Sequence, residues 1–188
     1  MRIRKLTLND LSKLIEISKS TFIEAFENQN NPDDFYAYVN SAFTFQTLTI
    51  ELNTEGVSFY FVENEKSEPI AYFKLTENKS PLHTSKPNIE IDFNFEGVKA
   101  TELDRIYVLS EHHGKGVAPI AMNYAMNLAK ENGCHFIWLG VWEHNPKAIR
   151  FYQKMGFEKF GTHIFEVGDD PQTDWLMWRK ISDYVIGD

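Results

Sequence analysis

The sequence predicts one α/β or α+β domain in which strands and helices alternate around a single sheet. Its 188 residues are 43% hydrophobic and 24% charged, which is ordinary for a globular protein that fills one core. Two Asn-Pro dipeptides, at 31–32 and 145–146, mark helix starts, and a glycine-rich turn joins the strand ending at Val108 to a helix. We therefore expect residues 1–188 to form a single domain.

The first half of the chain is predicted to form a strand, two helices and a hairpin. Arg2–Lys5 alternates as a short edge strand, and Asn9 is expected to cap a first helix whose apolar residues recur at helical spacing. Asn31 starts a second helix, with proline and two acids in its first turn. Val57–Val62 and Pro69–Leu75 are rich in β-branched and aromatic residues and flank a polar turn, which predicts the hairpin.

The second half alternates strands and helices more regularly. In chain order we expect a loop at Thr76–Asn88, a weak strand at Ile89–Phe95, a strand at Leu103–Val108, a helix at Ala118–Lys130, a strand at Phe136–Val141, a helix from Asn145 through Met155, and strands near Phe157–Val167 and Trp175–Ile181. Gly133 and Gly156 terminate the two helices, because glycine readily adopts the conformation that ends a helix.

Charge and composition exclude several kinds of partner. With 19 Lys and Arg against 27 Asp and Glu, the formal charge is −8, which argues against nucleic acid and anionic membranes and favours cationic ligands. The one cysteine, Cys134, excludes an internal disulfide and a cysteine-based zinc site. No apolar run approaches the ~20 residues of a membrane span, and Met1–Leu11 lacks an apolar signal core. We therefore expect a cytoplasmic protein that binds neither membranes nor nucleic acids.

The segment His113–Ala118, HGKGVA, has the chemistry of an anion site. Two glycines let backbone N–H groups approach a pyrophosphate, the following helix adds the positive end of its dipole, and Lys115 adds a charge. A Walker A loop is excluded because Lys115 is followed by glycine rather than Ser or Thr. A Rossmann fingerprint starting at Gly114 would need glycine or alanine at position 119, which is proline, and an acid near Cys134. The sequence meets neither condition. A plain glycine turn before a helix stays open as the structural alternative.

Two motifs occur in an order that is typical of one enzyme family. The segment fits the pattern Q/R-x-x-G-x-G/A, with Gly116 and Ala118 in the small positions and His113 in the Q/R position. Residues 145–157, NPKAIRFYQKMGF, match the pattern N-x-x-A-x-x-F-Y-x-x-x-G-F. Through these motifs the chain resembles the GNAT superfamily of N-acetyltransferases, strongly from Leu103 onward.

The resemblance implies a fold and a cosubstrate. The GNAT fold has a mixed, mostly antiparallel sheet of about seven strands, splayed between its fourth and fifth strands and flanked by about four helices. Acetyl-coenzyme A would be the acyl donor, and no metal is implied. The residues that would bind the coenzyme are Ile106, Tyr107, Val108, His113, Gly114, Lys115, Gly116, Val117, Ala118, Pro119, Asn145 and Tyr152.

The family mechanism implies roles for some of these residues. The backbone of Ile106–Val108 would pair with pantetheine, and the N–H of Val108 would stabilise the oxyanion of the intermediate. Asn145 would contact the pantetheine arm, and Tyr152 would be the catalytic acid that protonates the departing thiolate. Structural alternatives stay open, because Asn145 is also placed to cap a helix and Tyr152 shares an apolar helix face.

The sequence defines the acceptor less closely than the cosubstrate. Residues 138–143, WLGVWE, and 168–174, GDDPQTD, resemble PaiA-type spermidine/spermine acetyltransferases, which implies a polyamine acceptor. A protonated amine needs a base, and Glu102 and Asp104 are candidates on the central strand. The acids expected to form either a mouth for a polycation or a solvated face are Glu24, Glu27, Asp33, Asp34, Asp169 and Asp170.

Other functions stay open. An acetyltransferase for a protein N-terminus, an antibiotic or an amino acid would carry the same coenzyme loop. The alternative outside enzymes is a non-catalytic regulator that binds coenzyme A or a polyamine. Because members of the superfamily often dimerise, the resemblance also makes a homodimer a candidate assembly. The histidines without metal-ligand spacing to cysteines or acids, from which we infer no metal site, are His112, His113, His135, His144 and His163.

Overall fold

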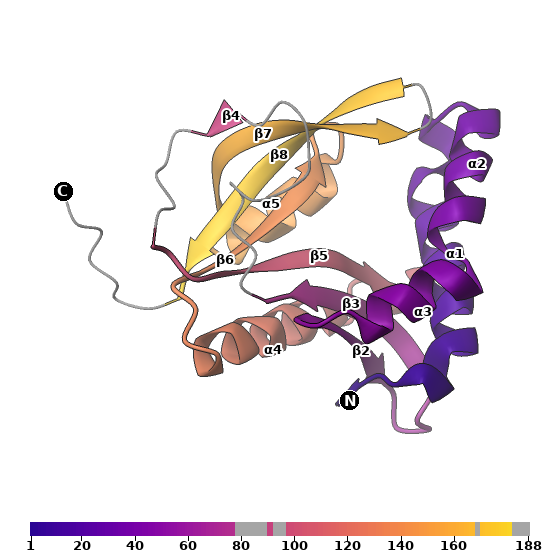
Figure 1. Ribbon diagram of the computed structural model, residues 1–188, viewed down its shortest axis with the longest axis horizontal. Helices are drawn as coiled ribbons and strands as arrows, with labels where there is room; N and C mark the ends of the chain where they lie inside the picture. Colours follow the sequence, from indigo (N-terminus) through magenta and orange to yellow (C-terminus); the bar gives the residue numbers. More distant parts are fainter. Residues whose placement is uncertain (78–89, 92–96, 168–169, 182–188) are drawn as a thin grey trace. The chain divides into compact units, whose positions relative to one another are not determined.

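A computed structural model describes residues 1–77, 90–91, 97–167 and 170–181 (Figure 1). The α-helices are α1 (Leu11–Phe26), α2 (Pro32–Ala42), α3 (Phe45–Asn53), α4 (Val117–Glu131) and α5 (Pro146–Lys154). The strands are β1 (Arg2–Lys5), β2 (Val57–Glu63), β3 (Pro69–Thr76), β4 (Glu90–Ile91), β5 (Ala100–Val108), β6 (Phe136–Trp142), β7 (Glu158–Val167) and β8 (Asp170–Lys180). The predicted loop Thr76–Asn88 and the predicted strand Ile89–Phe95 lie outside the described residues, except at 76–77 and 90–91.

The strands form a mixed sheet. Hydrogen bonding orders them β1-β2-β3-β5-β6-β8-β7-β4. The pairs β1/β2, β4/β7 and β6/β8 are antiparallel, whereas β5 and β6 run parallel. The parallel ladder runs only from Ala100–Phe136 to Glu102–Trp138, although both strands continue further. This confirms the predicted fold class, with eight strands and five α-helices in the described part of the chain.

The chain forms two compact units, and β5 and α4 contribute residues to both. The first unit consists of Met1–Leu75, Arg105–Met122 and the described residues within Val167–Asp170. The second consists of the described residues within Thr76–Asp104, Asn123–Glu166 and Pro171–Asp188. The chain passes from the second unit to the first between Asp104 and Arg105, inside β5.

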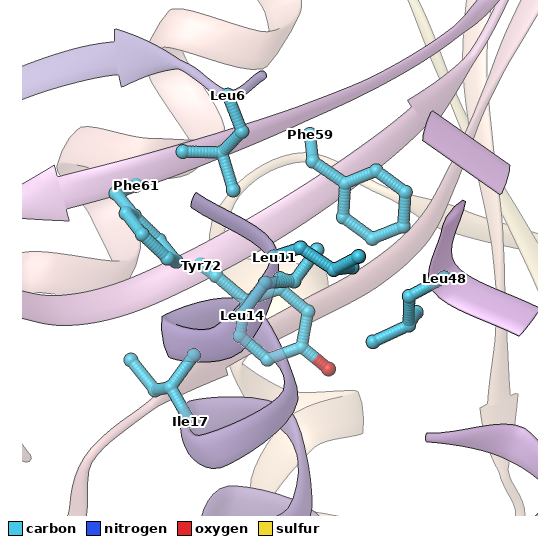
Figure 2. Packing of buried hydrophobic residues seen from close by; sticks show 8 residues of the cluster. All are labelled: Leu6, Leu11, Leu14, Ile17, Leu48, Phe59, Phe61 and Tyr72. Atoms are coloured by element: carbon cyan, nitrogen blue, oxygen red, sulfur yellow. The ribbon is translucent and has the colours of Figure 1, made fainter. Parts of the chain in front are cut away.

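The main core of the first unit packs α1 and α3 against β2 and β3. Figure 2 shows the cluster, whose members are Leu6, Leu11, Leu14, Ile17, Leu48, Phe59, Phe61 and Tyr72. Each fully buried Leu or Phe contributes about 2 kcal/mol to folding. Tyr107 and Leu109 pack against the same cluster, so it also fixes the end of β5.

An aromatic cluster lies between α1 and α2 in the same unit. Phe22, Phe35 and Phe43 are buried there, and the ring centroids of Phe22 and Phe35 are 5.7 Å apart. Tyr107 belongs to this cluster as well, with its ring 6.2 Å from Phe22 and 5.7 Å from Tyr72. One tyrosine of β5 therefore ties both clusters together.

The start of α1 differs from the prediction, whereas the start of α2 confirms it. Asn9 is not a cap: the Thr7 hydroxyl accepts the N–H of Asn9, and the Asp10 carboxylate accepts the N–H of Thr7. This capping box opens a short 3-10 turn, η1 (Leu8–Asp10), ahead of α1, because a threonine with an acid three residues later satisfies two free N–H groups. At α2, Asn31 Oδ1 accepts the N–H of Asp33 at 2.9 Å, as expected.

Helix α3 was not predicted. Thr44 caps it by accepting the N–H of Thr47 at 3.0 Å. Leu48 is its buried residue, whereas Phe45 and Ile50 are 67% and 60% exposed, so its apolar residues mark no single face. Within the part of the chain that the structure describes, no helix has both the length and the apolarity needed to cross a membrane.

The second unit is built around β6, β8 and α5. The β6/β8 ladder runs from Phe136–Lys180 to Trp142–Asp174. One face carries the buried cluster Ala100, Phe136, Trp138, Phe160 and Leu176. Arg179, on the other face, donates a hydrogen bond to the carbonyl of Met155 at the end of α5. Helix α5 therefore lies on the face opposite that cluster. The elements predicted from Leu103 to Ile181 are confirmed, although β5 begins three residues before the predicted start and β8 begins at Asp170 rather than Trp175.

Candidate active site

The loop between β5 and α4 has a backbone that requires glycine. After β5 come a 3-10 turn, η4 (Ser110–His112), and then Gly114 and Gly116 with φ of +75° and +78°. Other residues adopt such angles at a cost of about 1–2 kcal/mol. Among the described residues other than the adjacent ones in the chain, no atom lies within 4 Å of where a Cβ would stand on either glycine, so the space above the turn is open there. A ligand can therefore approach the main chain directly.

The first turn of α4 supplies the donors for an anion. Gly116 is the residue before the helix, because its carbonyl accepts the N–H of Ile120 at 3.3 Å. The N–H groups of Val117 and Ala118 then have no partner inside the helix, and Pro119 has no N–H. Lys115 is exposed beside them. The open space above the two glycines, the free N–H groups of the helix and the charge of Lys115 together suit a diphosphate.

Three hydrogen bonds fix this loop and the end of β5 within the first unit. His113 Nε2 lies 2.8 Å from the carbonyl oxygen of Val108, and because a carbonyl only accepts, Nε2 carries the hydrogen. The N–H of Leu109 donates to Ile70 on β3 at 3.0 Å. The N–H of Ser110 donates to Glu24 of α1 at 3.3 Å. The Nε2–H group of His113 therefore helps to shape the loop.

The end of β5 is held in place by its tyrosine. Ile106, Tyr107 and Val108 are all half-buried. The Tyr107 ring packs against Phe22 and Tyr72, as described above. The coenzyme segment predicted from the sequence, Ile106–Val108, thus has a rigid anchor in the first unit.

Helix α5 carries the other two predicted residues. Asn145 caps the helix, since its Oδ1 accepts the N–H of Ala148 at 3.0 Å, which confirms the structural interpretation of that asparagine. Tyr152 is 9% exposed, with ring centroids 5.3 Å from Phe151 and 5.9 Å from Phe157. Burial raises the pKa of Tyr152 well above its ordinary value, so its hydroxyl is protonated at neutral pH.

The two carboxylates proposed as bases are engaged by the fold. Glu102 is 2% exposed on β5, and Asp104 accepts a hydrogen bond from the hydroxyl of Thr76. Of the predicted acidic mouth, Glu24 binds Ser110 and Glu27 accepts the hydroxyl of Tyr36. Asp33 and Asp34 lie in the first turn of α2, Asp169 lies outside the described residues, and Asp170 is the first residue of β8. Among described side chains, no group of three or more suits a metal ion.

The sequence did not reveal a charged cluster beside β5. Arg105 donates two hydrogen bonds to Glu51 of α3, at 2.9 and 3.1 Å, and Lys74 Nζ lies 3.4 Å from the same carboxylate. These three side chains are 11–20% exposed. The cluster fixes α3 to β3 and β5. Its members are 23 to 54 residues apart in sequence (74−51, 105−51), so no local pattern could reveal it.

Comparison with known proteins supports one family. The model of the Acetyltransferase (GNAT) family matches residues 12–157. A protein of Lactobacillus delbrueckii subsp. lactis, named as an uncharacterized N-acetyltransferase in the pepI 3' region, is 32% identical over 181 residues, covering 96% of this chain and 98% of the relative. Streptothricin acetyltransferase of Streptomyces lavendulae is 38% identical over 55 residues, 29% of either chain.

Solved structures share the fold. The PaiA N-acetyltransferase of Thermoplasma acidophilum in complex with coenzyme A has a TM-score of 0.71 at 19% identity, covering 95% of this chain and 98% of that one. Mutant forms of the spermidine/spermine N-acetyltransferase SpeG of Vibrio cholerae give 0.65 at 21% identity, covering 97% and 96%. With the family match over residues 12–157 and a glycine loop that suits a diphosphate, this chain belongs to the GNAT acetyltransferase family and is an acetyl-coenzyme A-dependent N-acetyltransferase.

Proposed function

We propose that this enzyme transfers the acetyl group of acetyl-coenzyme A to a primary amine of a polyamine, by direct attack in a ternary complex. The observation that carries the proposal is the Gly114–Ala118 loop. Its two positive-φ glycines open onto free space, and the first turn of α4 directs N–H groups there. Such a cradle suits the diphosphate of a coenzyme, which supplies the activated acetyl group when bound.

The same residues divide the work of binding. The N–H groups of Gly116, Val117 and Ala118 hold the diphosphate, with Lys115 adding charge and Pro119 adding only shape. Gly114 and His113 set the turn, and the backbone of Ile106–Val108 pairs with the pantetheine arm. The helix cap uses Oδ1 of Asn145, so the Nδ2 hydrogens are the donors that a pantetheine carbonyl would need.

Two groups of the chain then act on the reacting atoms. The N–H of Val108 stabilises the oxyanion of the tetrahedral intermediate, a contribution of about 3 kcal/mol in comparable sites. The hydroxyl of Tyr152 protonates the departing thiolate. Burial raises the pKa of this phenol, so the group is in its protonated form when the thiolate departs.

A cationic acceptor agrees with charge and composition. The chain carries a formal charge of −8. In the first unit the half-buried rings of Phe26, Tyr38 and Tyr107 border the aromatic cluster, and aromatic faces attract ammonium groups. The carboxylate of Glu27 follows in the same stretch of chain. PaiA and the spermidine/spermine acetyltransferase SpeG, both structural neighbours, lend further support to a polyamine.

We also propose the setting in which the enzyme works. Its one cysteine, Cys134, is buried and forms no disulfide, which suits the reducing cytoplasm. We expect the whole chain to act as one catalytic domain, alone or as a homodimer. Size-exclusion chromatography with light scattering would distinguish the two assemblies.

An acceptor screen tests the proposal. Purified protein and acetyl-coenzyme A are mixed with spermidine, spermine, an aminoglycoside, streptothricin, free amino acids and short peptides, and the released thiol is measured. We expect the polyamines to give the highest kcat/KM. Preference for a peptide, an antibiotic or an amino acid would contradict the polyamine as acceptor. Binding of acetyl-coenzyme A without thiol release in the presence of any amine would identify a non-catalytic regulator.

A further inference from the structure

A histidine and a carboxylate share a space that β6 leaves empty. Gly140 has no positive φ, so the backbone of β6 does not require glycine there. A Cβ at that position would stand 3.2 Å from Asp174 Oδ2 and 3.4 Å from His163 Cε1. Glycine in the middle of a strand weakens it. We infer that Gly140 makes room for these two side chains.

The two side chains differ in access. His163, on β7, has a fully buried side chain, whereas that of Asp174, on β8, is 16% exposed, and His163 Nε2 lies 4.0 Å from Asp174 Oδ2. An imidazole this close to a carboxylate restricts its position and can hydrogen bond to it after a shift of about 1 Å. Asp174 is therefore the member that a ligand can reach, and His163 is the member behind it.

The pair lies on the face of the second unit opposite α5. In the β6/β8 ladder Asp174 is opposite Trp142 and Gly140 is opposite Leu176, so their side chains point to one face. Arg179 points to the other face, where it binds the end of α5. Tyr152 belongs to α5. The carboxylate and the tyrosine thus approach β6 from opposite sides.

Opposite sides suit opposite tasks in acyl transfer. The amine enters on one side of the acyl carbon and loses protons, whereas the sulfur leaves and gains one. The carboxylates that the sequence offered for the amine side are less suitable, because Glu102 is 2% exposed and Asp104 is bound by Thr76. Asp174 is an acid of the second unit that combines partial access with a second polar group behind it.

We propose that Asp174 binds the ammonium group of the acceptor and takes its first proton, with His163 as a positioning residue and Gly140 as the space that admits both. This inference rests on the proposed acetyl transfer. The ammonium gives one proton to Asp174, which passes it to solvent. The neutral nitrogen forms the C–N bond, the C–S bond breaks, and the thiolate takes the proton of Tyr152. The second proton lost by nitrogen restores Tyr152 through solvent, so amide, thiol and one proton are formed.

Two acceptors separate this role from a structural one. Asp174→Asn is compared with wild type using the best polyamine, which is protonated at pH 7, and hydroxylamine, which is mostly neutral. We expect kcat/KM for the polyamine to fall about 100-fold, while the value for hydroxylamine and the KM for acetyl-coenzyme A stay within about threefold. His163→Asn should lower the polyamine value about tenfold with the same selectivity. Glu158→Gln, an exposed acid of β7, is the matched control and should leave both acceptors unchanged.

Gly140→Ala provides a variant that keeps both chemical groups. Its Cβ displaces Asp174, so it should also slow the polyamine reaction selectively, and thermal unfolding checks that each variant is folded. Equal losses with both acceptors, or no loss with the polyamine, would overturn the role of Asp174. A wild-type enzyme that acetylates no amine at all would instead refute the proposed function.

Discussion

Tyr152 combines a buried ring with a hydroxyl that keeps its proton. The ring packs beside Phe151 and Phe157, and desolvation raises the pKa of the phenol. The sequence alone places Tyr152 on an apolar helix face, which is ordinary for a core position. The family motif is what makes Tyr152 the proposed acid, because burial alone is equally typical of a core tyrosine.

Replacing Tyr152 with phenylalanine tests the acid. We expect Tyr152→Phe to lower kcat about 100-fold, because the thiolate must then leave unprotonated or take its proton from water. The dissociation constant of acetyl-coenzyme A, measured by calorimetry, should change by less than about twofold, since the ring remains. Tyr60→Phe removes a hydroxyl from another buried tyrosine and serves as the control. Unchanged kcat in Tyr152→Phe would make this tyrosine structural.

Tyr72 predicts how stability depends on alkaline pH. Burial raises the pKa of Tyr72 to about 12, whereas the unfolded chain titrates near its ordinary value of about 10. The folded state therefore keeps a proton that the unfolded state loses, so this contribution is complete below pH 10 and disappears as pH rises toward 12. Between pH 10 and 12, the free energy of unfolding in urea should fall by about 2 kcal/mol less in Tyr72→Phe than in the wild type. Identical pH dependence in both proteins would contradict the shift.

At the scale of elements, the turn before α4 and the cap of α5 were predictable, whereas α3 was not. Glycines and Asn-Pro act locally, so their sequence spacing carries the geometry. Helix α3 buries Leu48 and exposes Phe45 and Ile50, so its periodicity misleads. The cluster at Arg105 joins segments that are far apart in sequence, and the pair of His163 and Asp174 depends on how the neighbouring strands β7 and β8 align, so neither is visible as a local pattern.

Two glycines with the same geometry separate binding from stability. Gly116 and Gly133 have φ of +78° and +70°, and both have open space at Cβ. Alanine at either position should cost about 1 kcal/mol of unfolding free energy, because the left-handed conformation is strained. Only Gly116→Ala should weaken the binding of acetyl-coenzyme A, with a dissociation constant about tenfold or more higher in calorimetry. Equal affinities for the two variants would show that the loop does not approach the coenzyme.

The Glu51–Arg105–Lys74 cluster, which joins α3 to β3 and β5, should contribute to the stability of the first unit. Glu51→Gln leaves Arg105 and Lys74 without their shared carboxylate, and we expect a loss of about 3 kcal/mol in urea unfolding. Glu16→Gln breaks a solvent-exposed pair with Lys13 and should cost less than about 1 kcal/mol. Similar small losses for both variants would mean that the cluster adds no stability.

At the scale of the whole molecule, the sequence predicted the order of elements and the family better than the acceptor. The coenzyme loop and the α5 motif are contiguous, so they survive as short patterns in residues 113–118 and 145–157. The aromatic border of the first unit and the carboxylate of Asp174 come from separate segments. The residues proposed to contact the acceptor therefore depend on tertiary packing within each unit, which a single sequence does not display.

The proposed acetyl transfer depends on binding of the diphosphate by the main chain of the β5–α4 loop. Calorimetry of the wild-type protein with acetyl-coenzyme A and with S-acetylpantetheine, which lacks the diphosphate and the adenosine 3′-phosphate attached to it, tests it most directly when read beside Gly116→Ala. We predict measurable affinity for acetyl-coenzyme A and at least about 100-fold weaker binding of S-acetylpantetheine, because the helix N–H groups and Lys115 lose their anion. Equal affinities, or no heat with acetyl-coenzyme A, would contradict it.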